Sequence, residues 1–334
     1  MNIPILAICD KSQEYVNSLM SLFQKKKALP FEIYGFTDKE KLNEFLQNRK
    51  LELLLITECQ YEPSLKQKAI HKIIVLTEKR YTTIEEMTCI CKYQAADSLY
   101  RSVMQAYSEE DNIVPLNQKE NKTLQIIGVY SPVHRVLQTT LSLTMGQILA
   151  EQKKVLYINF ECFSGFEQLM GKKFSGNLTD LLYFYKCDKE KLPYKLEGIV
   201  QELSGLHIIP PAGSYEDYES FQGMEWVSII ELFGKVGGYD IVLLDLSEQV
   251  RGLFQILDRC DKIYTVIKDE RMAKAKLAQY ELLLKRDDYG DIIAKTTKYE
   301  LPIFKCLPSE LERLNSCELA LYAKKMLTEG GFIS

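Results

Sequence analysis

The first third of the chain alternates short apolar runs with amphipathic stretches. The apolar runs lie at residues 3–8, 33–36, 51–56 and 73–76, and amphipathic stretches such as residues 15–23 and 39–46 separate them. Runs of this length suit buried strands, whereas the stretches between them have the spacing of helices. Alternating strands and helices are typical of a mostly parallel sheet with helices on both faces. Residues 1–107 are therefore predicted to form one α/β domain.

A second α/β pattern follows after residue 122. An apolar strand at residues 126–130 runs into a loop, and Thr139 and Thr140 then open an apolar helix. Residues 239–245 form a continuous apolar run that suits a parallel strand buried on both faces, and Asp245 stands at its carboxyl end. Residues 123–334 are therefore predicted to form a second α/β domain.

The segment between the two patterns and the overall composition agree with two domains. Residues 108–122 are polar, contain Pro115 and break both periodicities, so they are predicted to be a linker. A chain of 334 residues with 46% apolar content can bury two cores of ordinary domain size. No apolar run approaches the ~18 residues that span a bilayer, and residues 1–4 lack the basic flank of a signal peptide. We therefore expect a cytoplasmic protein without a transmembrane segment, which reaches the membrane through its partners.

Charge and cysteine content exclude two further classes of site. A net charge of −4 provides no electrostatic reason to expect nucleic-acid binding, and the basic run at residues 24–27 is expected to be a solvated helix end. The nine cysteines are scattered, apart from Cys89 and Cys91, and the chain has three histidines. This spacing indicates neither a disulfide framework nor a zinc site, so the thiols are expected to act as small buried hydrophobes.

The loop before Thr139 and Thr140 has the frame of a phosphate-binding loop. Residues 133–140 read Val-His-Arg-Val-Leu-Gln-Thr-Thr. They resemble the deviant Walker A motif of the MinD/ParA ATPases, in which the same positions read Lys-Gly-Gly-x-Gly-Lys-Thr-Thr. In that family the glycines let backbone N–H groups close around phosphates, and the lysines neutralise them. Here Val133 and Gln138 carry no charge, and Leu137 fills space that a glycine leaves for phosphate.

Further segments support this resemblance in order and spacing. Residues 154–161 resemble the family's second strand, which ends in two aspartates that activate the attacking water; here Asn159 and Glu161 occupy those positions. Residues 239–245 look like the Walker B strand and keep its aspartate. Residues 177–182 and 205–213 resemble segments of the CpaE-like pilus-assembly branch. The resemblance covers residues 123–334 and implies a P-loop NTPase-like fold with a degenerate Walker A motif.

The first domain resembles a response-regulator receiver, which has a flavodoxin-like fold. In that family an acidic residue after the first strand holds a metal, an aspartate after the third strand accepts a phosphoryl group, and Thr or Ser and Lys follow on the next two strands. Asp10, Thr77 and Lys92 fit these places, but the acceptor position falls on Thr57, which cannot form an acyl phosphate. Glu58 is one residue away and is expected to point to the other side of the sheet. The resemblance therefore implies a pseudo-receiver domain.

The candidate site residues of the second domain have two interpretations. If a nucleotide binds, the resemblance implies that Arg135, Gln138, Thr139 and Thr140 contact it, and that Thr139 and Asp245 hold magnesium. A helix N-terminus and Arg135 also favour an anion. Without a nucleotide, Thr139 is expected to cap its helix, and Asp245 is expected to cap the following loop through backbone N–H groups.

Three functions from different classes follow. The first is a catalytically inactive MinD/ParA/CpaE-like protein that serves as a scaffold or as a localisation or regulatory factor, in Flp/Tad-type pilus assembly or in secretion. Its partners would be other proteins, such as pilus or secretion components or a second copy in a homodimer, and no cofactor is expected. The second is an unorthodox ATPase that uses ATP and magnesium, with Arg135 replacing the lost lysines and Glu161 and Asp245 acting in catalysis. The third is a response-regulator-like signalling protein.

Two helical segments are candidates for an apolar dimer surface. They are residues 221–233 and residues 311–327. The second segment has apolar residues at helical spacing and could instead lie on a membrane. It is expected to pack on the sheet.

Overall fold

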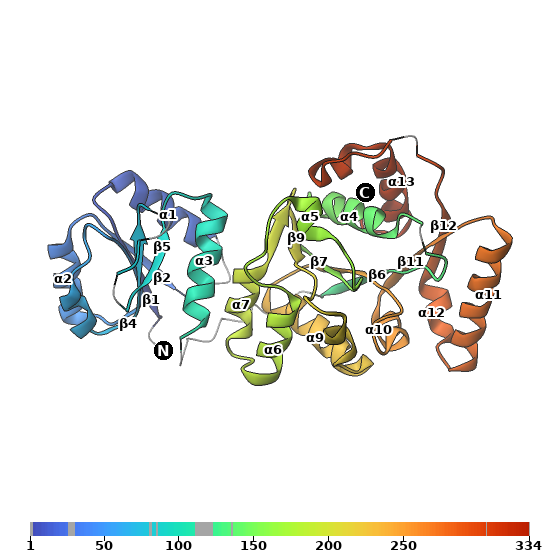
Figure 1. Cartoon of the computed structure of the whole chain (residues 1–334), viewed down its shortest axis with the longest axis horizontal. Helices are drawn as coiled ribbons and strands as arrows, with labels where there is room; N and C mark the ends of the chain where they lie inside the picture. Colours follow the sequence, from blue (N-terminus) through green and yellow to red (C-terminus); the bar gives the residue numbers. More distant parts are fainter. Residues whose placement is uncertain are drawn as a thin grey trace. The chain divides into compact units, whose positions relative to one another are not determined.

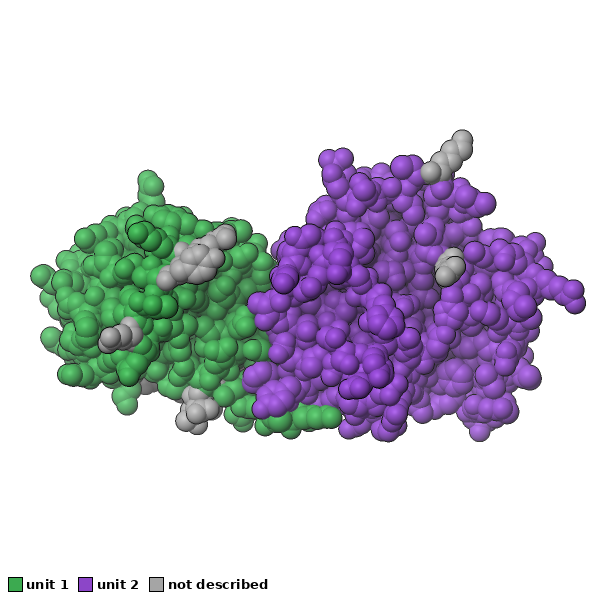
Figure 2. Space-filling model, viewed as in Figure 1, with its two compact units in different colours: residues 1–119, 186–198 green, residues 120–185, 199–334 purple. Residues whose placement is uncertain are grey.

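The computed structural model of the chain divides into two compact units (Figure 2). Unit 1 comprises Met1–Lys119 and Lys186–Gly198, and unit 2 comprises Glu120–Tyr185 and Ile199–Ser334. The structure describes residues 3–25, 31–79, 82–84, 86–110, 123–134, 136–304 and 306–333. Most of the predicted linker, and part of the basic run at residues 24–27, lie outside these ranges. Unit 1 includes a segment that the sequence pattern assigned to the second domain.

Unit 1 contains a parallel sheet whose described strands follow the order β2-β1-β3-β4-β5. The strands are β1 (Ile5–Cys9), β2 (Glu32–Phe36), β3 (Leu51–Thr57), β4 (Ile70–Thr77) and β5 (Thr88–Cys91), and the helices are α1 (Gln13–Lys25), α2 (Lys39–Asn48), the 3₁₀ helix η1 (Pro63–Gln67) and α3 (Ala96–Ser108). The first four strands match the predicted apolar runs. β1 and β3 are buried on both faces and therefore have few polar residues, whereas β2 lies at the edge of the sheet and is partly exposed.

The two faces of this sheet are covered by different helices. On one face α1 and α3 bury residues such as Phe23 and Tyr100 against the strands. On the other face α2 and η1 bury Leu42 and Leu65. Residues alternate between the two cores along each strand, which is the side-chain period of a β-strand.

Helix α7 (Leu192–Ile199) supplies an aromatic residue to the core of unit 1. Tyr194 is fully buried in the cluster on the α1 and α3 face. Its ring lies edge-on to Tyr107, with centroids 5.0 Å apart, and 6.5 Å from the ring of Phe31. A Cβ placed on Gly198 would lie 3.1 Å from the backbone nitrogen of Gln105, so the glycine permits close approach to α3. The core of unit 1 therefore depends on residues far along the chain.

Unit 2 contains a second sheet, whose described strands follow the order β12-β11-β6-β10-β7-β9-β8. All its neighbouring pairs are parallel except β8 with β9. The strands are β6 (Gln125–Val129), β7 (Val155–Asn159), β8 (Gln201–Leu203), β9 (Leu206–Ile209), β10 (Ile241–Asp245), β11 (Lys262–Ile267) and β12 (Thr296–Glu300). The predicted fold class, two α/β domains with mostly parallel sheets, is confirmed.

Helices cover both faces of this sheet (Figure 1). One face carries α4 (Gln138–Ala150) and α13 (Glu318–Glu329), with the 3₁₀ helix η2 (Leu311–Ser316) beside them, and the opposite face carries α9 (Gly223–Val236) and α10 (Leu253–Arg259). The remaining helices are α5 (Phe166–Met170), α6 (Leu178–Cys187), α8 (Tyr215–Glu219), α11 (Arg271–Arg286) and α12 (Gly290–Lys295). The last predicted helical segment packs on the sheet as expected, because Leu319 and Met326 lie in the core with α4.

The strand order brings three distant segments together at one edge of this sheet. β10 lies between β6 and β7, and Asp245 pairs with Val129 on one side and with Asn159 on the other. The chain passes from β6 to β7 in one direction and from β10 to β11 in the other. In open α/β sheets, such a switch point leaves a crevice outside the carboxyl ends of the strands. The candidate site lies at this edge.

Candidate functional site

The loop between β6 and α4 keeps the backbone shape that glycines would provide. His134 has φ 63° and Leu137 has φ 60°, both in the left-handed region. These are two of the positions at which the Walker A pattern has glycine. A residue with a Cβ occupies this region at a cost of roughly 1–2 kcal/mol. Two residues with a Cβ atom in this loop therefore adopt a backbone conformation that glycine adopts freely.

Asp245 at the end of β10 is fully buried, and both of its oxygens accept hydrogen bonds from side chains. Gln138 Nε2 donates to Oδ1 at 2.6 Å. Tyr157 Oη and Asn159 Nδ2 each donate to Oδ2 at 2.9 Å. The amide of Gln138 also donates to the carbonyl oxygen of Leu246 at 2.8 Å, and two acceptor partners establish which of its terminal atoms is nitrogen.

The protonation of Asp245 reflects two opposing effects. Burial raises the pKa of Asp245, and hydrogen bonds from Gln138, Thr139, Tyr157 and Asn159 oppose this rise without cancelling it. Burial, followed by the charge of Asp245, raises the pKa of Tyr157 well above its usual value, so the phenol stays a donor. The carboxylate is thus held by uncharged donors in a site from which water is excluded.

Asn159 connects this network to the next loop. Its amide nitrogen lies 3.0 Å from Tyr157 Oη, and its Oδ1 accepts the backbone N–H of Glu161 at 2.8 Å. Tyr157 was not predicted from the sequence as a site residue, although it lies two residues before Asn159 and on the same side of the strand. The alternation of side chains along β7 could therefore have identified it.

Glu161 lies at the half-buried rim of the site. Burial raises the pKa of Glu161, and the charges of Asp245 and Glu248 add to the rise. His134 Nε2 is 2.7 Å from Glu248 Oε1, and this pair joins the loop after β6 to the loop after β10. The described part of this rim therefore has two carboxylates beside one histidine, which is the opposite of the charge that a phosphate requires.

The other predicted nucleotide contacts have different outcomes. Arg135 lies outside the described residues. Helix α4 begins at Gln138 with Leu137 at its N-cap and no side-chain cap, so the prediction that Thr139 caps the helix is wrong. Thr139 instead lies beside Asp245 and helps to oppose the rise in the pKa of that carboxyl. Thr140 accepts a hydrogen bond at its backbone carbonyl from the hydroxyl of Thr144. The predicted capping of a loop by Asp245 is also wrong, because within the described residues only side chains donate hydrogen bonds to its oxygens.

The receiver-like residues of unit 1 meet at the carboxyl ends of its strands. Asp10 Oδ1 accepts the backbone N–H of Ser12 at 2.6 Å, and Lys92 Nζ lies 3.6 Å from Oδ2. Thr57 is buried, and its hydroxyl donates to the carbonyl of Cys9 at 3.4 Å. Thr77 donates to the carbonyl of Lys79. Glu58 is exposed and lies in the turn that follows β3.

Metal-ligand clusters and membrane-spanning helices were also sought in the described residues. Across these ranges, no three His, Cys, Asp or Glu side chains are placed to hold a metal ion. Within the same ranges, no helix is long and apolar enough to cross a membrane.

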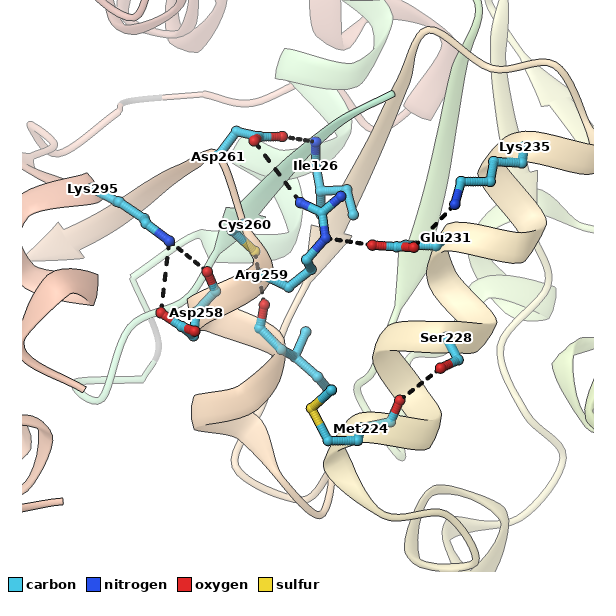
Figure 3. Close-up of polar contacts among 11 residues, drawn as sticks. Ile126, Met224, Ser228, Glu231, Lys235, Asp258, Arg259, Cys260, Asp261 and Lys295 are labelled. Atoms are coloured by element: carbon cyan, nitrogen blue, oxygen red, sulfur yellow. Dashed lines mark hydrogen bonds and ion pairs between the residues drawn. The ribbon is translucent and has the colours of Figure 1, made fainter. Parts of the chain in front are cut away.

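A separate polar network lies near the amino end of β6 (Figure 3). Arg259 Nε donates to Glu231 Oε1 at 2.5 Å, and Lys235 Nζ lies 3.2 Å from Glu231 Oε2. Asp261 Oδ2 accepts the backbone N–H of Ile126 at 2.7 Å. The hydrogen bond from Arg259 is the main cause that lowers the pKa of Glu231. This network joins α9 and α10 to the sheet at the end opposite the candidate site.

Comparison with known families identifies the first unit. Residues 1–108 match a family model described as the TadZ-like receiver domain. Residues 1–108 therefore form a TadZ-like receiver domain, and residues 186–198 of unit 1 lie outside the match. The chain as a whole matches no curated protein in sequence.

Solved structures similar to the chain include MinD/ParA-type proteins. A ParA family ATPase from Chlorobium tepidum is 15% identical, with 62% of this chain and 93% of that chain covered and a TM-score of 0.42. The MinD cell division protein of Aquifex aeolicus is 20% identical, with 54% and 70% covered and a TM-score of 0.39. A plasmid partition protein from Borrelia burgdorferi is 14% identical, with 62% and 100% covered and a TM-score of 0.44. At these identities the likeness concerns the fold alone.

Proposed function

We propose that this protein is a catalytically inactive scaffold or localisation factor that acts through other proteins. The observation that carries the proposal is the state of Asp245. In a P-loop site, the aspartate at this strand end serves a magnesium ion, which needs free carboxylate lone pairs or ordered waters. Here Gln138, Tyr157 and Asn159 donate to both oxygens of Asp245, and burial excludes water from it.

The residues present do not fit a magnesium nucleotide. Gln138 has an amide where the Walker A pattern has a lysine, and this amide already donates hydrogen bonds to Asp245 and Leu246. Leu137 has a branched side chain where phosphate would approach the backbone. Glu161 and Glu248 add negative charge near the same loop. Each of these features disfavours ATP binding, and together they support a unit that works without nucleotide.

A thermal-shift titration with ATP, ADP and GTP, each with magnesium, tests the inactive state. A ligand present at a hundredfold excess over its Kd stabilises the folded state by about 2.7 kcal/mol, which such an assay detects. We expect no shift with any nucleotide in the unmodified protein or in Asp245→Ala. A shift that disappears in Asp245→Ala, accompanied by phosphate release, would replace this proposal with the unorthodox ATPase.

The proposed setting is a Flp/Tad-type pilus or secretion system. It is supported by the resemblance of unit 2 to the CpaE-like pilus-assembly branch and by the TadZ-like match of unit 1. Crosslinking in the native host should recover pilus or secretion components, with the same set of partners for the unmodified protein and for Asp245→Ala. Partners unrelated to these systems would contradict the setting but leave the inactive state standing.

A further inference from the structure

A hollow of about 940 Å³ opens at the amino ends of the strands in unit 1. It is lined by the start of β1, by Glu32 of β2, by the turn between α2 and β3, and by the turn between η1 and β4. Asp10 and Lys92 stand at the opposite, carboxyl ends of these strands. The hollow is therefore separate from the receiver-like residues.

Three cationic side chains line this hollow without an anionic partner. In the described part of unit 1, Arg49, Lys50 and Lys68 make no ion pair or side-chain hydrogen bond. Other lysines of the same unit are paired: Lys39 with Glu62, and Lys72 with Glu110 at 2.5 Å. Unpaired cations gathered around a concave surface leave their hydrogen-bond donors available to a ligand.

The carboxylates of the hollow, in contrast, already have donors. Glu52 Oε1 accepts the hydroxyl of Tyr107 at 2.5 Å and lies 3.9 Å from Nε2 of His71. Glu32 Oε1 accepts the hydroxyl of Tyr34 at 2.6 Å. The carboxylates already accept hydrogen bonds, whereas the three cations have no partner among the described residues. The groups of the hollow that remain available to a ligand are therefore mainly hydrogen-bond donors.

The two turns that carry the cations are held together by the backbone. The N–H of Leu51 donates to the carbonyl of Ala69 at 3.0 Å, which joins the turn of Arg49 and Lys50 to the turn of Lys68. The three cations therefore lie on neighbouring turns that are hydrogen bonded to each other, and they can contact one ligand. Arginine can form a forked pair with a carboxylate or a phosphate, and lysine supplies a point charge to either.

We propose that this hollow binds a small molecule carrying two or more anionic groups. The volume lies within the range of small-ligand sites, and the three cations supply the complementary charge. The chemistry is shared by phosphates and carboxylates. This site is independent of the Asp245 network and of the proposed function.

Isothermal titration of the full chain at low ionic strength tests the site, with inorganic pyrophosphate in one arm and citrate in the other. The double variant Arg49→Ala with Lys68→Ala should weaken binding by about tenfold or more. Lys41→Ala is the matched control, because it removes an exposed lysine of α2 that does not line the hollow. This control should bind as the unmodified protein does.

Hydrogen exchange locates the ligand and shows that the variants are folded. Protection is expected at residues 48–52 and 68–71. Binding of pyrophosphate alone assigns a phosphate ligand, binding of citrate alone assigns a carboxylate ligand, and binding of both supports a general polyanion site. The proposal is overturned if neither probe binds at millimolar concentration, if Lys41→Ala weakens binding equally, or if protection appears elsewhere.

Discussion

Asp10 and Asp245 lie at the carboxyl ends of central parallel strands in the two units, and their hydrogen-bond partners differ. Both are buried, with exposed fractions of 4% and 0%. Asp245 accepts hydrogen bonds from neutral side chains on both oxygens. Asp10 accepts one backbone N–H on Oδ1, and its Oδ2 has no hydrogen bond in the described structure, with Lys92 as its cation at 3.6 Å.

The difference shows two ways in which a fold can hold a buried aspartate at the end of a strand. In unit 2, neutral donors surround the carboxylate. In unit 1, the charge of a lysine compensates the aspartate at a distance. A buried carboxylate without compensation costs several kcal/mol, so each site needs one of these solutions. The first is a closed network, whereas the second rests on one ion pair.

Comparing the two aspartates requires that the unfolding of each unit be observed separately. Tyr194→Ala tests whether this is possible, and it has the largest expected effect on stability. Removing a fully buried aromatic ring should destabilise unit 1 by roughly 3–5 kcal/mol. Hydrogen exchange in α3 should accelerate, while exchange in β6 and β10 stays unchanged. Tyr183→Ala removes a tyrosine that is 63% exposed and serves as the control. Faster exchange in β10 would show that the residue supports unit 2 instead.

Gln138→Leu tests the closed network of unit 2. The substitution leaves Asp245 Oδ1 and the carbonyl of Leu246 without this donor, and should destabilise unit 2 by about 1–3 kcal/mol. Calorimetry and hydrogen exchange in β10 measure the loss. Gln152→Leu, at an exposed position after α4, should leave the stability unchanged. An unchanged β10 in Gln138→Leu would mean that the amide is dispensable to Asp245.

Lys92→Met tests the ion pair of unit 1, with an expected loss of about 1–2 kcal/mol, between a surface pair and a buried one. Burial lowers the pKa of Lys92, but the hydrogen bond to Glu78 and the charge of Asp10 outweigh it and raise the pKa above its usual 10.5. The stabilisation is therefore complete below pH 10.5 and is lost as the pH rises through the folded-state pKa. The variant should lack this alkaline loss, which pH-dependent unfolding of unit 1 measures. An identical alkaline profile would contradict the role of Lys92.

Arg259→Met tests the amino-end network and has the smallest expected effect, below about 1 kcal/mol, because the pair is partly exposed. The pKa of Glu231 is lowered, so its contribution is present above the unfolded pKa and is lost as the pH falls through the folded pKa. The variant should flatten the stability profile of unit 2 on the acid side. Arg271→Met, which changes an exposed arginine of α11, should retain the slope.

Much of the fold was predictable because its signals are local. The apolar runs at residues 33–36 and 51–56 became β2 and β3, with ends that differ by one residue at most. The N-terminus of α4 illustrates what the sequence did not predict. Two threonines suggested the N-cap, but the helix begins at Gln138. A cap is a hydrogen-bond geometry, and residue type alone does not determine it.

The sequence by itself determined the alternation of strands and helices in both units, the aspartates at two strand ends, and the absence of lysine and glycine from the loop before α4. These properties follow from residue identity and from periods of two or 3.6 residues. The tertiary structure alone decided that Gln138 bonds Asp245 across 107 positions of the chain, and that Tyr194 completes the core of unit 1. Such contacts depend on strand order and on the return of distant segments, which local patterns do not encode.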